Sequence, residues 1–400
     1  MIDQGKLVNL ILGAVIALLP FYIEISFVPM ERSGKDFVSI LIMLLLFFVM
    51  PDKKRDAPIA LKAFGFFALF LFVFNRPEVF PLISNEKTLT ATLVNQINTI
   101  SAINEIALIN TQSIFILCAI SFLVCLYERI DTSTLKHILD GISIGVILQA
   151  SIAIIAWMGF DIYRFTVLTL NPISKFTQFG DQNSIGFKTF LGNPNILASY
   201  LSIGVFSLFR KRWAYFIPLV LVGLILTKSS LGVAVFVISF VLMMTWPEVR
   251  EVWGLVLAGI ILAYFTFITI DPLSMSSGRF DLINSILSRF PFEKSLLGVG
   301  PGWLAIQDIR IEKVVISQAH NELLESFLIF GILGPVIYLW IVKKALRANR
   351  SPFTWILLAS FINSLGHFNL HISVTVFIFI TALVACLALG SDKNYDKLEW

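Results

Sequence analysis

Apolar residues along this 400-residue chain are gathered in continuous blocks that alternate with shorter polar segments. The blocks run for about 14 to 24 residues, and most are long enough as α-helix to cross the roughly 30 Å hydrocarbon core of a bilayer. Transmembrane β-strands are shorter and alternate apolar with polar residues, a pattern these blocks lack. The pattern therefore predicts an all-α polytopic membrane protein.

About twelve transmembrane helices are predicted, in one integral membrane domain over residues 1–400 with no separate soluble domain. The first block lacks the basic segment and the small-residue cleavage site of a signal peptide, so we expect it to be a retained helix. The predicted spans are residues 7–28, 37–51, 58–75, 106–127, 135–159, 194–209, 213–227, 230–246, 252–270, 322–342, 353–366 and 372–390.

Short basic segments set the predicted orientation of these helices. The segments PDKKRD (51–56), RKRW (210–213) and KKALRANR (343–350) fall on one side if twelve spans alternate. The positive-inside rule makes that side cytoplasmic, and both termini lie there as well. The outer face then receives three long loops, at about residues 76–105, 160–193 and 271–321. Loops of this length are typically functional or disordered, so a catalytic site is expected on the outer face.

The third outer loop is too apolar to be a disordered segment. Its sequence SILSRFPFEKSLLGVGPGWLAIQ mixes apolar residues with Gly and Pro turns. We expect short helices lying at the membrane interface there, with Phe290, Phe292 and Trp303 at headgroup depth.

Composition agrees with a membrane location. Hydrophobic residues make up 57% of the chain and charged residues 14%, with a mean hydropathy of +0.85, whereas a soluble chain is about one quarter charged. The net charge of +4 comes from cations beside apolar blocks, which argues against nucleic-acid binding. All three cysteines lie within apolar blocks, where small buried residues are expected rather than disulfides or metal ligands.

The tripeptide His320-Asn321-Glu322 stands at the start of the apolar block 322–342. Histidine titrates near neutral pH, which suits a general base or a group that orients an acceptor hydroxyl. The alternative is an ordinary helix start, because Asn321 is a good N-cap and Glu322 suits a first helical turn.

Candidate anion ligands lie in the predicted outer segments. Arg279 and Arg289 are in the third outer loop, and Lys228 lies in LTKSSLG (226–232) between two apolar blocks. A guanidinium group can hold a phosphate with two hydrogen bonds, although it can equally extend to lipid headgroups. A lysine between apolar spans is costly unless it faces water or a partner, so Lys228 is a functional candidate.

The segment KTFLGNPNILASY (188–200) combines a turn with amide side chains. Gly192 and Pro194 predict the turn, while Asn193 and Asn195 can cap a helix or bind sugar hydroxyls. Lys188 is a further candidate anion contact, or an interfacial anchor.

Two other motifs are interpreted as structural. GVGPG (298–302) lacks the Gly-Lys-Ser/Thr of a phosphate-binding loop and is predicted to form a turn. His367 and His371 are four residues apart, but a zinc site needs further ligands and none stands in that segment, so no metal site is predicted.

Taken together, the motifs FLGNPNILASYL, LTKSSLG, SGRFDLINSIL, SLLGVGPGWL and AHNELLESFLIFGILG resemble the O-antigen ligase and polymerase superfamily of bacterial envelope glycosyltransferases. They occur in family order over roughly residues 185–345, and AHNELLE…GILG is the most specific of them. The predicted topology with large outer loops also fits this family.

The resemblance implies an inverting, metal-independent sugar transfer at the periplasmic face of the bacterial inner membrane, without a cofactor. It implies that the donor is a glycan on undecaprenyl pyrophosphate and that the acceptor is a lipid A–core sugar in a ligase or another lipid-linked repeat unit in a polymerase. By this similarity His320 positions or deprotonates the acceptor hydroxyl and Arg279 neutralises the pyrophosphate.

One departure from the family pattern concerns the LTKSSLG motif. Many relatives carry Arg after the Ser, whereas this chain has Ser230, so Lys228 or Lys188 would supply the missing charge. The leading prediction is an O-antigen ligase, and the nearest alternative is a polymerase of O-antigen or exopolysaccharide repeat units. Pilin O-glycosylation and, in a different class, transport of a lipid-linked glycan are further alternatives. The glycan, the acceptor sugar, the linkage and the oligomeric state do not follow from the sequence.

Overall fold

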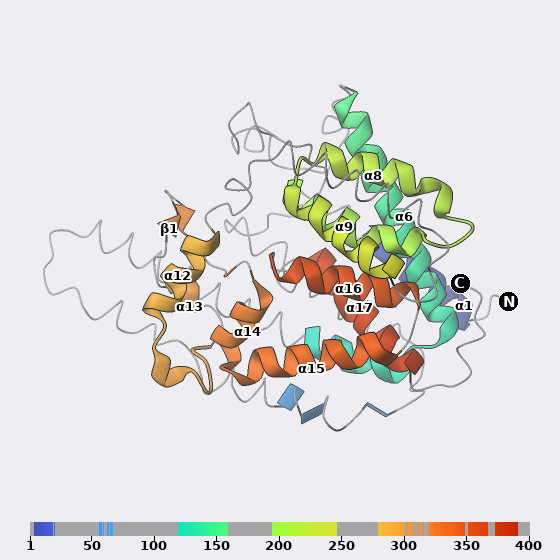
Figure 1. The fold of residues 1–400 in the computed structure, drawn as a ribbon. Helices are drawn as coiled ribbons and strands as arrows, with labels where there is room; N and C mark the ends of the chain where they lie inside the picture. Colours follow the sequence, from blue (N-terminus) through green and yellow to red (C-terminus); the bar gives the residue numbers. More distant parts are fainter. Residues whose placement is uncertain are drawn as a thin grey trace, which may run out of the picture.

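The computed structural model describes the fold in eight main stretches of the chain. They are residues 4–18, 119–158, 194–245, 279–300, 303–306, 321–348 and 351–366, followed by 373–390, with isolated positions at 20, 56, 57, 59, 62, 63, 65, 66, 310, 311, 314, 315 and 319. At some of these positions, including Arg279, only the backbone is described. Apart from a hairpin of two-residue strands, the regular structure in these stretches is helical, as predicted (Figure 1).

The larger part of the structure is a helical bundle with one continuous core. Its members are α1 (Gln4–Leu18), α6 (Thr132–Trp157), α7 (Pro194–Gly204) with η3 (Val205–Leu208), η4 (Ala214–Phe216), α8 (Ile217–Leu226), α9 (Ser230–Thr245), α15 (Leu333–Ala348), α16 (Pro352–Ser364) and α17 (Ser373–Gly390). Residues 119–129 are helical as well and contribute Phe122 and Leu126 to the core.

Glycines allow the bundle helices to approach closely. A Cβ added at Gly141 of α6 would lie 2.3 Å from the carbonyl oxygen of Gly13 in α1. A Cβ on Gly232 of α9 would lie 2.5 Å from the Cβ of Ala198 in α7. Small residues at helix crossings are typical of helices packed within membranes, because they let backbones come together without a hydrophobic driving force.

A smaller group of elements, which we call the second lobe, lies to one side of the bundle (Figure 1). It comprises α12 (Arg279–Arg289), η6 (Phe292–Lys294), α13 (Trp303–Ile306), the hairpin β1 (Arg310–Ile311) and β2 (Val314–Val315), and α14 (Glu322–Phe330). Its core is separate from that of the bundle and consists of Leu282, Ile286, Phe290, Val299, Trp303, Leu304, Ala319 and Leu328.

This core corrects part of the prediction for the third outer loop. Short helices are present, but Phe290 and Trp303 are only 3% and 7% exposed, with ring centroids 6.0 Å apart in an edge-to-face contact. Both rings therefore fill the core of the lobe rather than reach the headgroups. Phe292 is 66% exposed and remains available for an interfacial role.

The predicted span 322–342 is not one continuous helix, because the helix breaks at residues 331 and 332. Gly331 has φ 63° and ψ −157°, a backbone conformation that residues other than glycine essentially never adopt. The N–H of Ile332 donates to the carbonyl of Ser295 at 2.8 Å, and the N–H of Val299 donates to Leu328 at 2.6 Å. The break arises because the turn at residues 295–299 pairs with this backbone. The resulting α14 has nine residues, about 14 Å of helix, so it is not a membrane-crossing segment.

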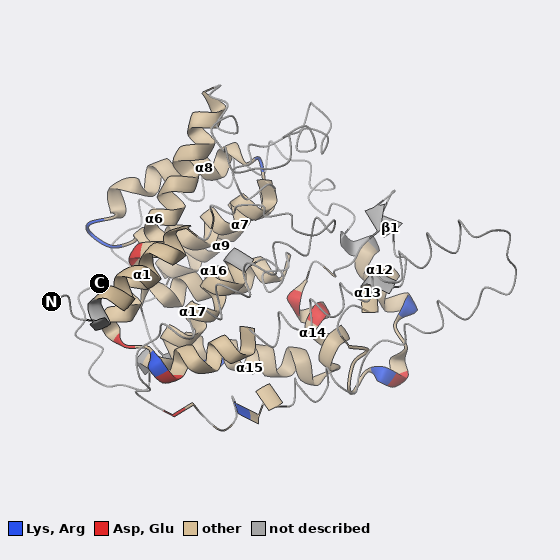
Figure 2. Ribbon diagram, turned by 180° about the vertical axis from the view of Figure 1, so that it is seen from behind, with Lys and Arg blue, Asp and Glu red and all other residues tan. Residues whose placement is uncertain are grey.

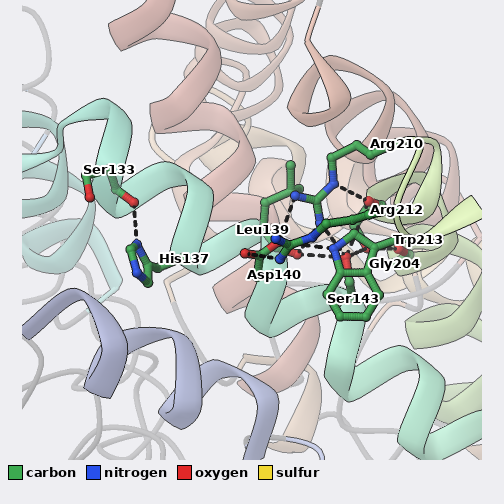
Figure 3. Close-up of polar contacts among 10 residues, drawn as sticks. Ser133, His137, Leu139, Asp140, Ser143, Gly204, Arg210, Arg212 and Trp213 are labelled. Atoms are coloured by element: carbon green, nitrogen blue, oxygen red, sulfur yellow. Dashed lines mark hydrogen bonds and ion pairs between the residues drawn. The ribbon is translucent and has the colours of Figure 1, made fainter. Parts of the chain in front are cut away.

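Figure 2 shows the acidic residues of α14, Glu322 and Glu325, and the side chains of both are buried. The most connected charged group joins α6 to the turn before η4 (Figure 3). Asp140 accepts from Arg210 at 2.8 Å, from Arg212 at 2.5 Å and from the indole N–H of Trp213 at 3.2 Å. Arg210 also donates to Ser143 Oγ at 2.8 Å. Arg210 and Lys228 lie at opposite ends of η4–α8, as the predicted topology requires.

Among the described stretches, α6 is the one helix that is long and apolar enough to cross a membrane, with a mean hydropathy of 2.1 over its most apolar part. Six other apolar helices in these stretches have between 10 and 17 residues. A buried core helix meets the same criterion as α6. The all-helical fold class is thus confirmed, while the number of membrane spans stays a prediction.

Candidate functional site

Motifs far apart in the sequence meet where α7, α9, α14 and α16 come together. Gly232, in the motif LTKSSLG, packs against Ala198 in the motif FLGNPNILASYL. The adjacent Ser199 donates to Asn363 Oδ1 in α16 at 3.1 Å, and both side chains are buried. Two residues beyond Asn363, the chain meets the start of α14. Because each contact leads to the next, these segments form one continuous region.

Asn321 connects α14 to this region by both ends of its amide. Its Oδ1 accepts from the N–H of Leu324 at 3.0 Å and so caps the helix, as the sequence predicts. Its Nδ2 donates to the carbonyl of Leu365, after α16, at 2.8 Å. Asn321 is therefore fixed to its own helix and to a neighbouring one. We call the region around Ser199, Asn321 and Asn363 the candidate site.

Glu325 fixes the chain on the other side of His320. Its Oε2 accepts the N–H of Ala319 at 2.8 Å, across the start of the helix. Glu325 is 5% exposed and Ala319 is 2% exposed, so the bond is shielded from water. Both chain neighbours of His320 are thus anchored. His320 itself lies outside the described residues.

Two buried carboxyl groups lie in the first turns of α14. Glu322 and Glu325 are 2% and 5% exposed, and the positive end of the helix dipole favours their charge. Burial nevertheless raises the pKa of Glu325 to about 7, and the hydrogen bond from Ala319 opposes this rise. The Glu325 carboxyl consequently changes charge near neutral pH.

Lys228 occupies a locked turn between α8 and α9. It has φ 54° and is the one non-glycine residue with positive φ in the part of the chain that the structure describes. Its neighbours Thr227 and Ser229 are buried, with Thr227 Oγ1 donating to Leu224 O at 2.6 Å and accepting from Ser229 N–H at 3.2 Å. Lys228 itself is exposed. Left-handed backbone at a lysine costs free energy, which motivates a functional reading of this turn.

The two predicted arginines lie at opposite ends of α12, whose 11 residues extend about 15 Å. Arg289 ends the helix next to Phe290, whose ring lies 5.0 Å from that of Phe327 in the later part of α14. Arg279 begins the helix at the end away from that contact. The two arginines therefore occupy separate positions, one at each end of the helix.

The remaining predicted site residues divide into two groups. Asn195 is exposed in the first turn of α7, beside the candidate site. Lys188 and Asn193 lie outside the described residues, as do His367 and His371, which were weighed for zinc. No group of three or more potential metal ligands occurs within the described stretches.

Of the motif GVGPG, the structure describes residues 298–300, where Gly298 and Gly300 have φ of 77° and 88° directly after a turn at residues 295–297. Sequence reasoning missed the carboxyl of Glu325 and the Ser199–Asn363 contact. A glutamate five residues after the histidine, inside an apolar block, was the available signal for the first. The polar residues of α16 carried no comparable signal, because their partner comes from α7.

Compared with protein-family models and with curated proteins, the chain gives no match. The motifs and the geometry of the candidate site are therefore what indicate a function for this chain.

Proposed function

We propose that this chain is a membrane-embedded, metal-independent glycosyltransferase of the O-antigen ligase type. It moves a glycan from undecaprenyl pyrophosphate to a lipid A–core acceptor at the periplasmic face of the bacterial inner membrane. About twelve membrane-spanning helices with cytoplasmic termini, as the hydropathy pattern predicts, belong to this proposal. The single observation that carries it is that both chain neighbours of His320, Ala319 and Asn321, are anchored by hydrogen bonds.

The proposed reaction is a displacement at the anomeric carbon of the donor sugar. The acceptor hydroxyl oxygen forms a bond to that carbon, and the bond to the pyrophosphate oxygen breaks with its electron pair staying on the leaving group. His320 accepts the hydroxyl proton. Arg279 and Lys228 stabilise the negative charge that develops on the pyrophosphate, and cations held in place before the reaction do this best.

The geometry supports these roles in two ways. The two described neighbours of His320 are each held by a hydrogen bond, and a general base requires a supported backbone for alignment with the acceptor. Lys228 stands in a left-handed turn between two buried hydroxyl residues and is itself exposed, so its charge is accessible to a phosphate group. Ordinary helix capping accounts for Asn321, but it accounts for neither the Glu325 bond nor the Lys228 turn.

The first test uses a bacterial strain that lacks its own ligase. Wild-type protein is expected to transfer polymer to lipid A–core, and His320→Ala is expected to abolish the transfer at matched membrane abundance. His137→Ala is the matched control, because His137 lies on α6, where its Nδ1 is 2.7 Å from the carbonyl of Ser133 (Figure 3). Transfer that survives His320→Ala would show that the histidine only begins a helix.

A repeat-unit polymerase is the second candidate, favoured by Ser230 at the first position of α9, where ligase-like relatives carry arginine. Supplying purified lipid-linked donor together with lipid A–core separates the two. Lengthening of the lipid-linked chain without decoration of the core would replace the ligase assignment by the polymerase.

A further inference from the structure

Glu325 makes a contact that helix capping does not explain. In a capping box, the third helical residue reaches back to the N–H of the N-cap. Here the N-cap is Asn321, and Glu325 is the fourth helical residue. Its side chain passes the N-cap and accepts from Ala319, two residues before it. The bond therefore bridges over His320 rather than closing the helix.

The two anchors hold the chain on either side of position 320, and they lead to different parts of the molecule. Ala319 belongs to the core of the second lobe, and Asn321 is bound to the end of α16 in the bundle. The segment is thus fixed from both sides of the junction between lobe and bundle.

We propose that Glu325 is a positioning residue for glycan transfer, which holds the backbone of the Ala319–Asn321 segment so that His320 is aligned with the acceptor hydroxyl. This inference rests on the proposed function. In this role Glu325 contacts neither the glycan donor nor the acceptor sugar. It acts through the N–H of Ala319, so the role requires only a side-chain oxygen within hydrogen-bond distance of that N–H.

Two conservative variants test separately the length and the charge of the Glu325 side chain. Glu325→Gln keeps an acceptor oxygen at the same distance but removes the charge. Glu325→Asp keeps the charge but shortens the side chain by one methylene, so the bond to Ala319 is lost. Glu293→Gln is the matched control, since Glu293 is an exposed carboxylate on η6 in the same lobe.

The experiment measures donor-dependent transfer by the full-length protein in nanodiscs, together with hydrogen exchange at the Ala319 amide. Glu325→Gln is expected to keep kcat within about threefold and to keep the amide protected. Glu325→Asp is expected to lower kcat by roughly 100-fold, the size of effect that a misplacement of about 1 Å can have. The KM for the donor should change by less than about threefold, because binding groups elsewhere are unchanged.

Each other outcome overturns the inference in a recognisable way. An equal loss of kcat in Glu325→Gln and Glu325→Asp would mean that transfer depends on the charge of the side chain and not on its length. Full activity in Glu325→Asp, with His320→Ala inactive, would remove the positioning role and leave the proposed function standing. No transfer by wild-type protein would overturn the proposed function, and the role with it. A Glu325 variant that fails to fold is recognised by a lowered melting temperature of the bundle.

Discussion

The bundle and the second lobe bury their apolar side chains by different means. In the bundle, straight helices pack side by side, and glycines in helical conformation bring backbones together, as at Gly141 and Gly232. In the second lobe, short helices are joined by turns, and the core depends on backbone hydrogen bonds between residues 294–299 and 328–332. Gly298 and Gly331 there have φ of 77° and 63°.

This difference in packing suggests that the bundle acts as a scaffold, whereas the geometry of the second lobe depends on individual residues. A bundle of apolar helices tolerates many substitutions as long as volume and pattern are kept. The second lobe tolerates fewer substitutions, because its positive-φ glycines hold backbone conformations that other residues rarely adopt. The candidate site lies where the two regions meet, with Ser199 and Asn363 from the bundle and Glu325 from the lobe.

The largest expected effect is that of Gly331→Ala. A Cβ at this position would lie 2.2 Å from the carbonyl oxygen of Leu296, and the backbone conformation is strained for alanine. We expect a loss of about 3 kcal/mol or more in the stability of the second lobe. Hydrogen exchange should rise in peptides covering residues 292–304 and 319–334, and glycan transfer should be lost.

Gly141→Ala provides the contrast for this prediction. Its added Cβ would meet the Gly13 carbonyl at 2.3 Å, so α1 and α6 must move apart. Here the melting temperature of the bundle should fall while exchange in the second lobe is unchanged. If both substitutions raised exchange in both regions, the bundle and the lobe would unfold as one unit and the comparison would fail.

A second prediction concerns pH, because the buried carboxyl of Glu325 belongs to the lobe. Its pKa is raised from 4.5 to about 7, so the folded state holds the proton more tightly than the unfolded state. The stability due to this group is present below pH 4.5 and is lost as pH rises towards 7. Between these values the change corresponds to roughly 3 kcal/mol at most.

Glu325→Gln carries no such group, so its stability relative to wild type should improve as pH rises. The measurement compares exchange in the second lobe at pH 5 and pH 8 in both proteins, after correction for the intrinsic exchange rate. Glu293→Gln, at an exposed position, should show no such dependence. An equal response of Glu325→Gln and wild type to pH would mean that Glu325 keeps one charge state throughout this range.

The bundle could be predicted from the sequence, and the lobe largely could not. Predicted spans 194–209, 230–246, 353–366 and 372–390 differ by a few residues from α7 with η3, α9, α16 and α17. Long apolar blocks have few alternatives to helix, which is why this worked. The break in 322–342 was missed because its cause lies at residues 295–299, far away in the sequence.

The candidate site shows the same limit. Asn321 was expected to cap a helix, and it does, because capping depends on local sequence. The partner of Glu325 and the left-handed turn at Lys228 depend on contacts formed only in the folded chain. Residue chemistry identified Lys228 as a candidate, but only the structure shows that its neighbours are buried.

The smallest expected effect tests whether charge contributes to the bundle as well. Arg210 is 8% exposed and binds Asp140, Ser143 Oγ and the carbonyl of Ser207, so Arg210→Ala removes a buried donor that these three groups share. We expect a loss of about 2 kcal/mol in bundle stability. Arg212 also binds Asp140, but it is 64% exposed, so Arg212→Ala should cost less than about 1 kcal/mol.

Melting temperatures of both variants in one detergent measure this difference, and exchange in the second lobe should not change in either. Equal melting temperatures would mean that the buried contacts of Arg210 add nothing beyond a surface ion pair. In that case the bundle would be stabilised by apolar packing alone, and polar contacts that determine geometry would be confined to the lobe and to its junction with the bundle.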